Sequence, residues 1–415
     1  MVNYQGFLAF GAFNAVAKRL GRRLGLGVGL LLIGTTLLAQ PLSDQAEISL
    51  LTYSPSDELY AAFGHSALRV RDPSSSLDVV YNYGMFSFTE GNFYFKFAQG
   101  KLNYWLGAYE FQYLAAEAQQ RNCTIREQVL NLTSTEQQAV YKYLTTNLLP
   151  KNRYYRYDFF YDNCVTRVRD LMQQVLGDRL RLDTSFVQDY SFRDLIDLYM
   201  EPQAWGDLGI DLALGARIDQ RAPAVDYLFL PAYAAQSFAN SRVVCDGEAV
   251  PLVKEEIVLF EEHPDQEVAS VGFWQPEWIF SAILGVVLLV TFLTRHRPPV
   301  YWPDALLFAL YGLLGLVLLL LWFATNHQAT HNNYNLLWLH PLHLLSAALL
   351  LRKKKGLGTK LYLLLNGLGG LLLLAMWDVI PQAYHPAFIP LVVLLAFRYF
   401  YTYSTIELRN KQLTH

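Results

Sequence analysis

Cysteine and charge are both scarce in this sequence, and each scarcity excludes a class of protein. Three cysteines among 415 residues are too few for a disulfide-stapled scaffold or for a zinc module held by thiolates. Charged residues make up 17%, against about 25% in typical soluble domains, and a net charge of −3 offers no basic surface for nucleic acid. Hydrophobic residues reach 53% and mean hydropathy is +0.17, so the chain is neither disordered nor typical of a soluble enzyme.

The few charges are concentrated in one part of the chain. Residues 40–273 contain 32 acidic and 19 basic side chains, a difference of −13. Beyond them the sequence is mostly aliphatic and aromatic, in five stretches: residues 278–294, 305–324, 336–351, 361–376 and 388–401. A helix needs about 20 residues to span a bilayer. The second stretch reaches that length, and the short third, fourth and fifth need their Trp, Tyr and His flanks. Five such stretches in close succession predict a transmembrane domain of five α-helices.

The loops between these stretches alternate in basic content. Lys and Arg follow the first, third and fifth stretches, for example at Arg295, Arg352 and Arg409, whereas residues 325–334 and 378–387 contain neither. Basic loops face the cytoplasm, so we expect the C-terminus inside and the acidic part of the chain outside. Basic residues before the apolar run at 24–38 are typical of a signal peptide, with an uncleaved signal anchor as the alternative.

These patterns predict five segments. They are a signal segment at residues 1–39, an exported domain at 40–254, an acidic linker at 255–273, the membrane spans at 274–405 and a cytoplasmic tail at 406–415. The exported domain combines strand and helix patterns, which indicates an α+β fold. Strands are predicted at 66–71 and 79–83, joined by a turn at 72–76, and at 124–132. Helices are predicted at 134–148, with Thr133 or Ser134 as cap, at 163–176 and at 228–240.

Two residues of the exported domain suggest thiol chemistry. Cys164 directly follows Asn163, a good helix N-cap, so its thiol is expected in the first helical turn. There the helix dipole and free N–H groups favour a thiolate. Residues 40–273 contain two histidines, and His263 lies in the acidic linker, which leaves His65, at the entry to a strand, as the candidate general base. The two residues predict a nucleophilic cysteine activated by an imidazole.

Each of these residues also has a structural explanation. A cysteine is most often a small buried hydrophobe, and His65 could be a strand-end histidine with a satisfied hydrogen bond. An exported domain permits disulfides, so Cys123 and Cys245 could be paired, or both could be buried thiols.

Several longer motifs resemble a known family. They are GHSALRV at residues 64–70, YNYGMF at 81–86, NFYFKF at 92–97, GKLNYWL at 100–106, NRYYRYDFFYDNC at 152–164 and NNYNLLW at 332–338. Together they resemble the family named for the N-terminal periplasmic domain of Lnb, a lipoprotein N-acyltransferase, over residues 48–235 and in the membrane part. The order of histidine strand and cysteine helix is also similar to a circularly permuted papain-like fold, as in the lecithin:retinol acyltransferases.

The resemblance implies a thiol-dependent acyltransferase of the bacterial inner membrane, with a permuted papain-like catalytic domain in the periplasm. Cys164 would take an acyl chain from a membrane phospholipid as a thioester, and the acceptor would be the N-terminal amine of a diacylated lipoprotein. His65 would be the base. Asn82, the nearest match to the third polar residue of such sites, would orient His65 and fix its tautomer. No cofactor is implied.

Other polar residues are candidates for substrate binding, and all lie near the nucleophile or at the outer face of the membrane part: Tyr161, Asn163, Arg156, Asn335, His340 and His343. Polar groups within a span are costly and often functional. The outer histidines have no acidic partner close in sequence, so no metal site is predicted. Two rival hypotheses remain open, a papain-like membrane-bound peptidase or amidase of the cell envelope and a non-enzymatic envelope scaffold.

Overall fold

The computed structural model describes residues 41–56, 58–87, 96, 99–245, 247–263 and 274–412. The predicted signal segment, the motif at 92–97 apart from Lys96, and most of the predicted linker beyond residue 263 lie outside these residues.

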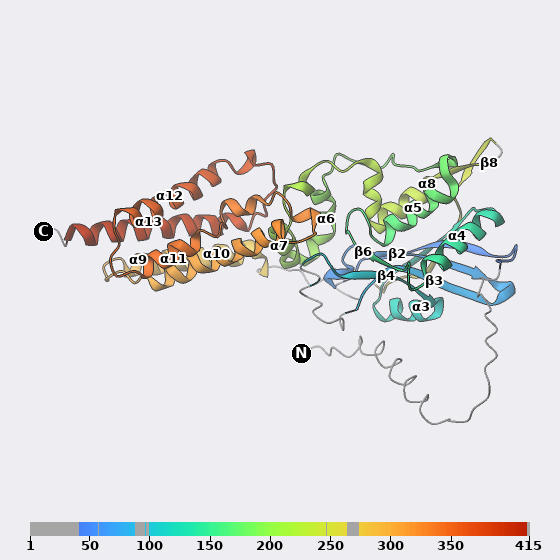
Figure 1. Cartoon of the computed structure of the whole chain (residues 1–415), viewed down its shortest axis with the longest axis horizontal. Coiled ribbons are helices and arrows are strands. Elements are labelled where there is room, and N and C mark those ends of the chain that lie inside the picture. Colours follow the sequence, from blue (N-terminus) through green and yellow to red (C-terminus); the bar gives the residue numbers. More distant parts are fainter. Residues whose placement is uncertain are drawn as a thin grey trace, which may run out of the picture. The chain divides into compact units, whose positions relative to one another are not determined.

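The N-terminal part, residues 41–263, is built on an antiparallel sheet of seven strands (Figure 1). In spatial order the strands are β10 (Val253–Phe260), β5 (Ile125–Leu130), β1 (Glu47–Tyr53), β2 (His65–Asp72), β3 (Leu77–Met85), β4 (Asn103–Glu110) and β6 (Tyr154–Arg156). The central strands are buried on both sides because helices cover both faces of the sheet. Helix α3 (Phe111–Gln120) lies on one face, and α5 (Cys164–Leu176) and α8 (Pro231–Asn240) lie on the other (Figure 1).

Several smaller elements complete this part. They are α4 (Ser134–Asn147), α6 (Phe192–Met200), α7 (Ala204–Ala213), the 3-10 turn η6 (Ala216–Asp219), and a small sheet of β7 (Leu180–Arg181), β8 (Arg242–Cys245) and β9 (Glu248–Pro251). Of these, α6, α7 and η6 matter most for the site, because they connect it to the outer loops of the C-terminal part.

Most of the predicted elements are confirmed. The strands at 66–71 and 79–83 are β2 and β3, and the helix at 163–176 is α5 with Asn163 as its N-cap. Thr133, rather than Ser134, caps α4, since its side chain accepts from the Glu136 N–H and the Glu136 carboxylate bonds back to the Thr133 N–H. The helix expected from residue 228 begins only at Pro231, after a 3-10 turn (Ala224–Phe229).

One expectation is corrected, and one of the two alternatives left open for the cysteines is excluded. Residues 255–260, predicted as the start of an acidic linker, belong to the edge strand β10, which pairs with β5. Its acidic side chains lie on an exposed edge, where charge is compatible with a strand. Cys123 and Cys245 are not paired, since all three cysteines are free thiols. Cys123 lies just before β5 of the seven-stranded sheet, whereas Cys245 lies at the end of β8 in the small sheet.

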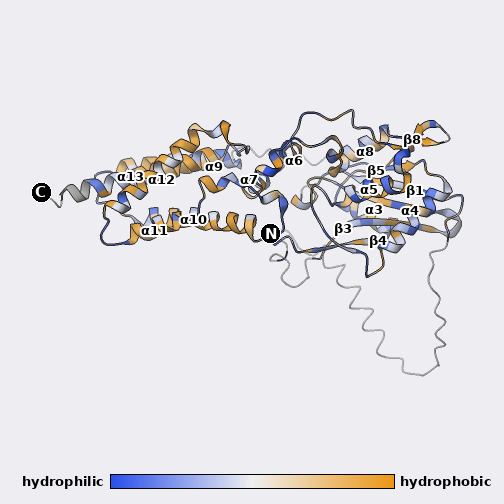
Figure 2. Cartoon of the chain, turned by 45° about the horizontal axis from the view of Figure 1, so that its top comes forward, coloured by the Kyte–Doolittle hydropathy of each residue, from blue (hydrophilic) through white to orange (hydrophobic). Residues whose placement is uncertain are grey.

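The C-terminal part is helical. Four of its helices are long and apolar enough to cross a membrane: α9 (Pro276–Thr294), α10 (Trp302–Phe323), α12 (Leu357–Ala375) and the first 20 residues of α13 (Phe388–Gln412). Apolar residues cover these helices in Figure 2. The third predicted stretch, residues 336–351, includes the end of a 3-10 turn (Tyr334–Leu337) and then α11 (His343–Leu351), whose nine residues are too few to span alone. The count of five spans therefore stays a prediction.

The end of α7 and the turn η6 are hydrogen-bonded to the loop that precedes α11. The Asn335 Nδ2 donates to the Asp211 carbonyl at 3.0 Å, and the Gly215 N–H donates to the Ala329 carbonyl at 2.9 Å. A Cβ at Gly215 would lie 2.1 Å from the His331 carbonyl oxygen. Only glycine therefore permits this approach of the two backbones.

Candidate active site

Cys164 is held at the first turn of α5 by an extensive cap. The Asn163 Oδ1 accepts from the Val165 and Thr166 N–H groups, both at 2.9 Å, and the Thr166 Oγ1 accepts from the Asn163 N–H at 2.8 Å. The Asn163 Nδ2 donates to the Phe159 and Phe229 carbonyls, each at 2.8 Å. Cys164 itself is 6% exposed. This cap fixes the thiol at the positive end of the helix dipole.

His65 approaches the thiol from the start of β2. Gly64, directly before it, has a φ of +74°, and a Cβ there would lie 2.6 Å from the Tyr53 carbonyl oxygen. This glycine therefore sets the direction in which the chain enters β2. The His65 Nε2 donates to the Asn82 Oδ1 on β3 at 2.6 Å, and the Cys164 thiol is close enough to His65 for the charges of the two groups to act on each other. Since Nε2 is used by Asn82, Nδ1 is the ring nitrogen that serves Cys164.

The electrostatics of this pair favour a thiolate. Burial opposes charge on both groups and is the largest single influence on each. The charge and hydrogen bond of His65, together with backbone hydrogen bonds from Ser66 and Val165, nevertheless lower the pKa of the Cys164 thiol. The thiolate in turn raises the pKa of His65. The pair is therefore shifted toward thiolate and imidazolium.

Two phenols stand beside the thiol. Burial, and then the charge of Cys164, raise the pKa of Tyr157 and that of Tyr155 above the ordinary tyrosine value. Both hydroxyls therefore stay protonated and can donate hydrogen bonds. Gly84, with a φ of +87° where the β3–β4 register shifts, lies next to Tyr157 and the thiol: a Cβ there would be 3.7 Å from the Tyr157 ring and 3.9 Å from the Cys164 Cβ. Sequence reasoning did not place these phenols or Gly84 beside the thiol, although all three lie in motifs it had singled out.

The structure thus brings Cys164, His65 and Asn82 together, and it places the other candidates differently. Asn163 is 2% exposed and uses its side chain for the cap. Tyr161, only three residues before the nucleophile, is 47% exposed. Arg156, on β6, donates to the Lys101 carbonyl. Of these three, Tyr161 and Arg156 are exposed and Asn163 is buried, and substrate binding by any of them stays a prediction.

The candidates in the C-terminal part are used internally. The Asn335 Nδ2 bonds to the Asp211 and Leu212 carbonyls, and its Oδ1 accepts from the Trp338 indole N–H. The His343 Nε2 donates to the Trp338 carbonyl and its Nδ1 accepts from the Tyr399 hydroxyl. These contacts favour a structural role for both side chains. The stacked neighbour of His343, His340, differs, because its Nδ1 is buried without a hydrogen-bond partner among the described residues.

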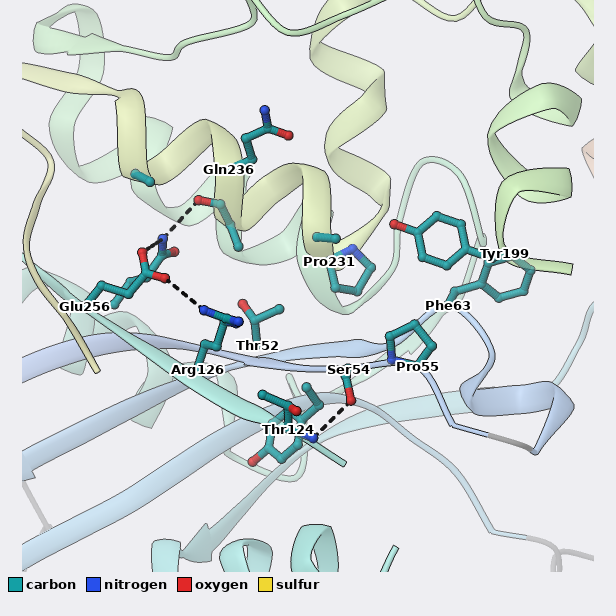
Figure 3. Close-up of a pocket in the computed structure, with 15 residues that line it drawn as sticks. Thr52, Ser54, Pro55, Phe63, Thr124, Arg126, Tyr199, Pro231, Gln236 and Glu256 are labelled. Carbon is teal, nitrogen blue, oxygen red and sulfur yellow. Dashed lines mark hydrogen bonds and ion pairs between the residues drawn. The ribbon is translucent and has the colours of Figure 1, made fainter. Parts of the chain in front are cut away.

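Two cavities flank the catalytic segment. The larger, about 430 Å³, lies between α8 and the sheet, with Phe63 and Tyr199 at one end and Arg126 and Glu256 at the other (Figure 3). The smaller, about 90 Å³, adjoins His65 and Asn82. Its volume suits a few water molecules rather than a substrate.

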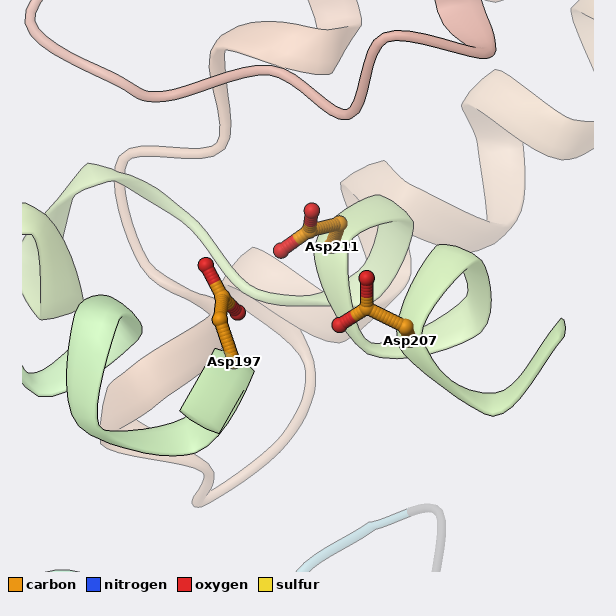
Figure 4. Close-up of side chains that lie close together, drawn as sticks. All are labelled: Asp197, Asp207 and Asp211. Carbon is orange, nitrogen blue, oxygen red and sulfur yellow. The ribbon is translucent and has the colours of Figure 1, made fainter. Parts of the chain in front are cut away.

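Three carboxylates could together hold a cation. Oxygens of Asp197 on α6 and of Asp207 and Asp211 on α7 lie within 4.8 Å of one another (Figure 4). Burial, and then the two neighbouring carboxylates, raise the pKa of Asp197 to about 7. Arg193 pairs with Asp211, and the His385 Nε2 lies 3.5 Å from Asp207. Protein cations and a proton therefore already offset this charge, and we assign no metal to it. The sequence did not predict the cluster, because α6 and α7 had not been predicted.

Comparison with known families matches both parts of the chain. Residues 38–197 match the Lnb N-terminal periplasmic domain, and residues 267–411 match the Lnb transmembrane domain. No curated protein and no solved structure matches the chain. The first match includes Cys164, His65 and Asn82. The two matches confirm the resemblance that the motifs indicated, and the chain has a periplasmic domain of sheet and helices followed by a membrane domain with about four apolar helices.

Proposed function

Because the chain belongs to the Lnb family, we propose that it is a lipoprotein N-acyltransferase of the bacterial inner membrane, with a thiol nucleophile facing the periplasm. The observation that carries this proposal is the contact chain from Cys164 to His65 to Asn82 at the start of α5. The donor would be a membrane phospholipid, and the acceptor the N-terminal amine of a diacylated lipoprotein.

In the first step, the Cys164 thiolate attacks the carbonyl carbon of a phospholipid ester. The tetrahedral intermediate collapses with cleavage of the ester C–O bond, and the proton on the His65 Nδ1 passes to the departing alkoxide. The products are an acyl thioester on Cys164, a lysophospholipid and a neutral His65. Asn82 supports this step by accepting from Nε2, which keeps the ring oriented and the proton on the correct nitrogen.

The negative oxygen of the intermediate needs hydrogen-bond donors. The Val165 and Thr166 N–H groups are occupied by the Asn163 cap, so the helix start offers fewer free donors than the sequence suggested. We assign this role to the Cys164 N–H and the protonated Tyr157 hydroxyl. Preoriented donors of this kind stabilise the transition state more than the ester itself.

In the second step, the acceptor amine attacks the thioester. His65, now neutral, takes a proton from the attacking nitrogen, the C–S bond breaks, and the Cys164 thiolate is released next to the imidazolium. An amide forms, and the enzyme returns to its starting state. Water in place of the amine would give hydrolysis, which is the reaction expected of the rival peptidase or amidase.

The domain limits fit this proposal. We propose that residues 40–260, which include the edge strand β10, carry catalysis, that residues 274–405 cross the inner membrane several times, and that the tail from 406 is cytoplasmic. The membrane helices would keep the thiol at the outer leaflet, where both lipid substrates are found.

Mass spectrometry of lipoprotein N-termini tests the proposed function. Cells that carry the protein should contain lipoproteins with an amide-linked third acyl chain, and cells with Cys164→Ala in its place should contain only diacylated forms. Identical N-termini in the two strains would contradict the proposal. Release of peptides from cell-wall fragments by the unsubstituted protein would support the peptidase instead.

A further inference from the structure

The larger cavity, called here the α8 cleft, is open because one face of α8 carries mostly small side chains. Ala232, Ala235, Gln236 and Ala239 line it and recur at intervals of three, four and seven residues, so they share one side of the helix. Figure 3 shows this side of α8 above the strands, with the cleft between them. The volume of about 430 Å³ falls within the range of small-ligand sites, about 300–1,000 Å³.

The floor of the α8 cleft is polar. Thr52 on β1 lies opposite Arg126 on β5, and Gln128 on β5 lies opposite Glu256 on β10. Cross-strand partners point to the same face of a sheet, so these side chains form one surface, and Arg126 and Glu256 form an ion pair at 3.7 Å. The opposite face of the same strands carries apolar Leu51 and Ile125, which cluster with Ala118 of α3, and also buried Glu127, which pairs with Arg69.

Two atoms of the floor lack partners. The Thr52 Oγ1 and the Gln128 Oε1 are buried without a hydrogen bond to any described residue, and the two side chains are 9% and 2% exposed. Buried polar groups are nearly always hydrogen-bonded, because an orphan has lost its water without compensation. Both residues line the cleft. A ligand that offers a donor to Gln128 and either a donor or an acceptor to Thr52 would satisfy them.

One end of the α8 cleft adjoins the catalytic segment. Phe63 lies two residues before His65, and its ring packs against Phe159 with centroids 4.8 Å apart. The Phe159 carbonyl accepts from the Asn163 cap of the Cys164 helix. The contact between Phe63 and Phe159 therefore links this end of the cleft to the cap of the Cys164 helix.

We propose that the α8 cleft binds the polypeptide segment that follows the acylated amine of the acceptor. An acyl chain would need an apolar floor, whereas a polypeptide presents N–H and C=O groups at regular intervals, which match the unpaired atoms of Thr52 and Gln128. This inference rests on the proposed function, because it concerns the second substrate of the same reaction. It makes the enzyme specific for polypeptide amines and not for lipid amines in general.

The test compares two acceptors after Cys164 has been acylated from a labelled phospholipid. One is S-diacylglyceryl-cysteine amide, and the other carries five further residues. Two variants alter the cleft: Ala235→Leu fills it, and Thr52→Val removes the orphan hydroxyl while keeping the shape. Ala139→Leu, on the exposed side of α4, is the matched control. Rates of transfer are expressed per acylated enzyme, so that a misfolded fraction does not contribute.

The unsubstituted enzyme and the control should prefer the long acceptor. Thr52→Val should lower transfer to the long acceptor by about three- to tenfold, the effect of one hydrogen bond, and Ala235→Leu should remove the preference. Equal preference in all four proteins would overturn the inference and leave the proposed function standing. A changed chain-length preference for the donor in Ala235→Leu would also overturn it, in favour of an acyl chain in the cleft. Absence of any thioester in the unsubstituted enzyme would refute the proposed function, and the inference with it.

Discussion

At the scale of single residues, the reactivity of Cys164 depends on how far its interaction with His65 offsets the effect of burial on the pKa of the thiol. Cys164 is almost wholly enclosed, which by itself disfavours a thiolate. The imidazole of His65 reverses this, and Asn82 holds that imidazole at 2.6 Å. The reactivity of Cys164 therefore depends on these neighbours, and substituting them should change the pKa of the thiol.

The pH dependence of Cys164 alkylation should reveal this coupling. In a background with Cys123→Ala and Cys245→Ala, the alkylation rate should rise with pH through a midpoint below about 8.5, the value of a free thiol, because the folded protein lowers the pKa of Cys164. His65→Ala removes the stabilising charge but keeps most of the burial, so its midpoint should move to higher pH. Equal midpoints, measured with iodoacetamide and mass spectrometry, would show that His65 does not act on the thiol.

Asn82 is expected to act as a positioning residue. Asn82→Ala removes a hydrogen bond to a charged group, worth about 1.5–3 kcal/mol, so acylation of Cys164 should slow by about 10- to 100-fold. Asn82→Asp keeps an acceptor for the His65 Nε2 and adds a negative charge that raises the pKa of His65. It should retain more activity, and the loss of acylation at alkaline pH, where His65 loses its proton, should shift to higher pH. An aspartate variant no better than the alanine variant would contradict this role.

At the scale of secondary-structure elements, local signals explain what the sequence could predict. The caps of α4 and α5 lie within three residues of the groups they bond, so short motifs sufficed for both helices and for the position of Cys164. The histidine strand and Asn82 also followed from local patterns and resemblance. By contrast, β10 pairs with a strand more than 120 residues away, and its acidic residues resembled a linker. The α8 cleft, Tyr157 beside the thiol and the cluster on α6 and α7 arise only from tertiary packing, which the sequence pattern does not encode.

The Asn163 cap should matter for stability as well as reactivity. Asn163→Ala removes two cap bonds and leaves the buried Phe159 and Phe229 carbonyls without their donor. Loss of a cap costs about 0.5–2 kcal/mol and an orphaned buried group about 1–3 kcal/mol, so the free energy of unfolding should fall by about 3 kcal/mol. Denaturant titration in detergent would measure it. Ser134→Ala, at an exposed position of α4 that does not provide the cap, is the control and should change stability little.

At the scale of the whole molecule, one buried arginine connects the periplasmic segments to the membrane loops. Arg193 is 2% exposed and pairs with Asp211 and Asp219. The Asp219 carboxylate also accepts from the Ala383 N–H, and the Asp211 carbonyl accepts from Asn335. Residues from α6, α7, η6 and two outer loops therefore meet at this point, and its position along the chain gives no hint of these partners.

Loss of this arginine should be costly. Arg193→Ala leaves the buried Asp211 carboxylate and the partly exposed Asp219 carboxylate without their cation. Loss of one partner of a buried ion pair typically costs about 3–5 kcal/mol. We expect a lower midpoint of thermal unfolding and cleavage by protease at the end of α7. Arg221→Ala is the control, because its ion pair with Asp189 is exposed and such pairs contribute about 0–1 kcal/mol. If the two variants were equally stable and equally resistant to protease, the ion pairs of Arg193 with Asp211 and Asp219 would not stabilise the protein.

The acyl thioester on Cys164 is the most direct test of the account. The purified full-length protein is incubated with a phospholipid that carries a labelled acyl chain, without any acceptor, and the label is located by peptide mapping. The label should lie on Cys164 and be released by neutral hydroxylamine, as expected of a thioester. It should be absent from Cys164→Ala, and an acceptor amine added afterwards should remove it as an amide. Transfer of the acyl chain to the amine in the Cys164→Ala variant, or in an enzyme that never carries the label on Cys164, would contradict the mechanism.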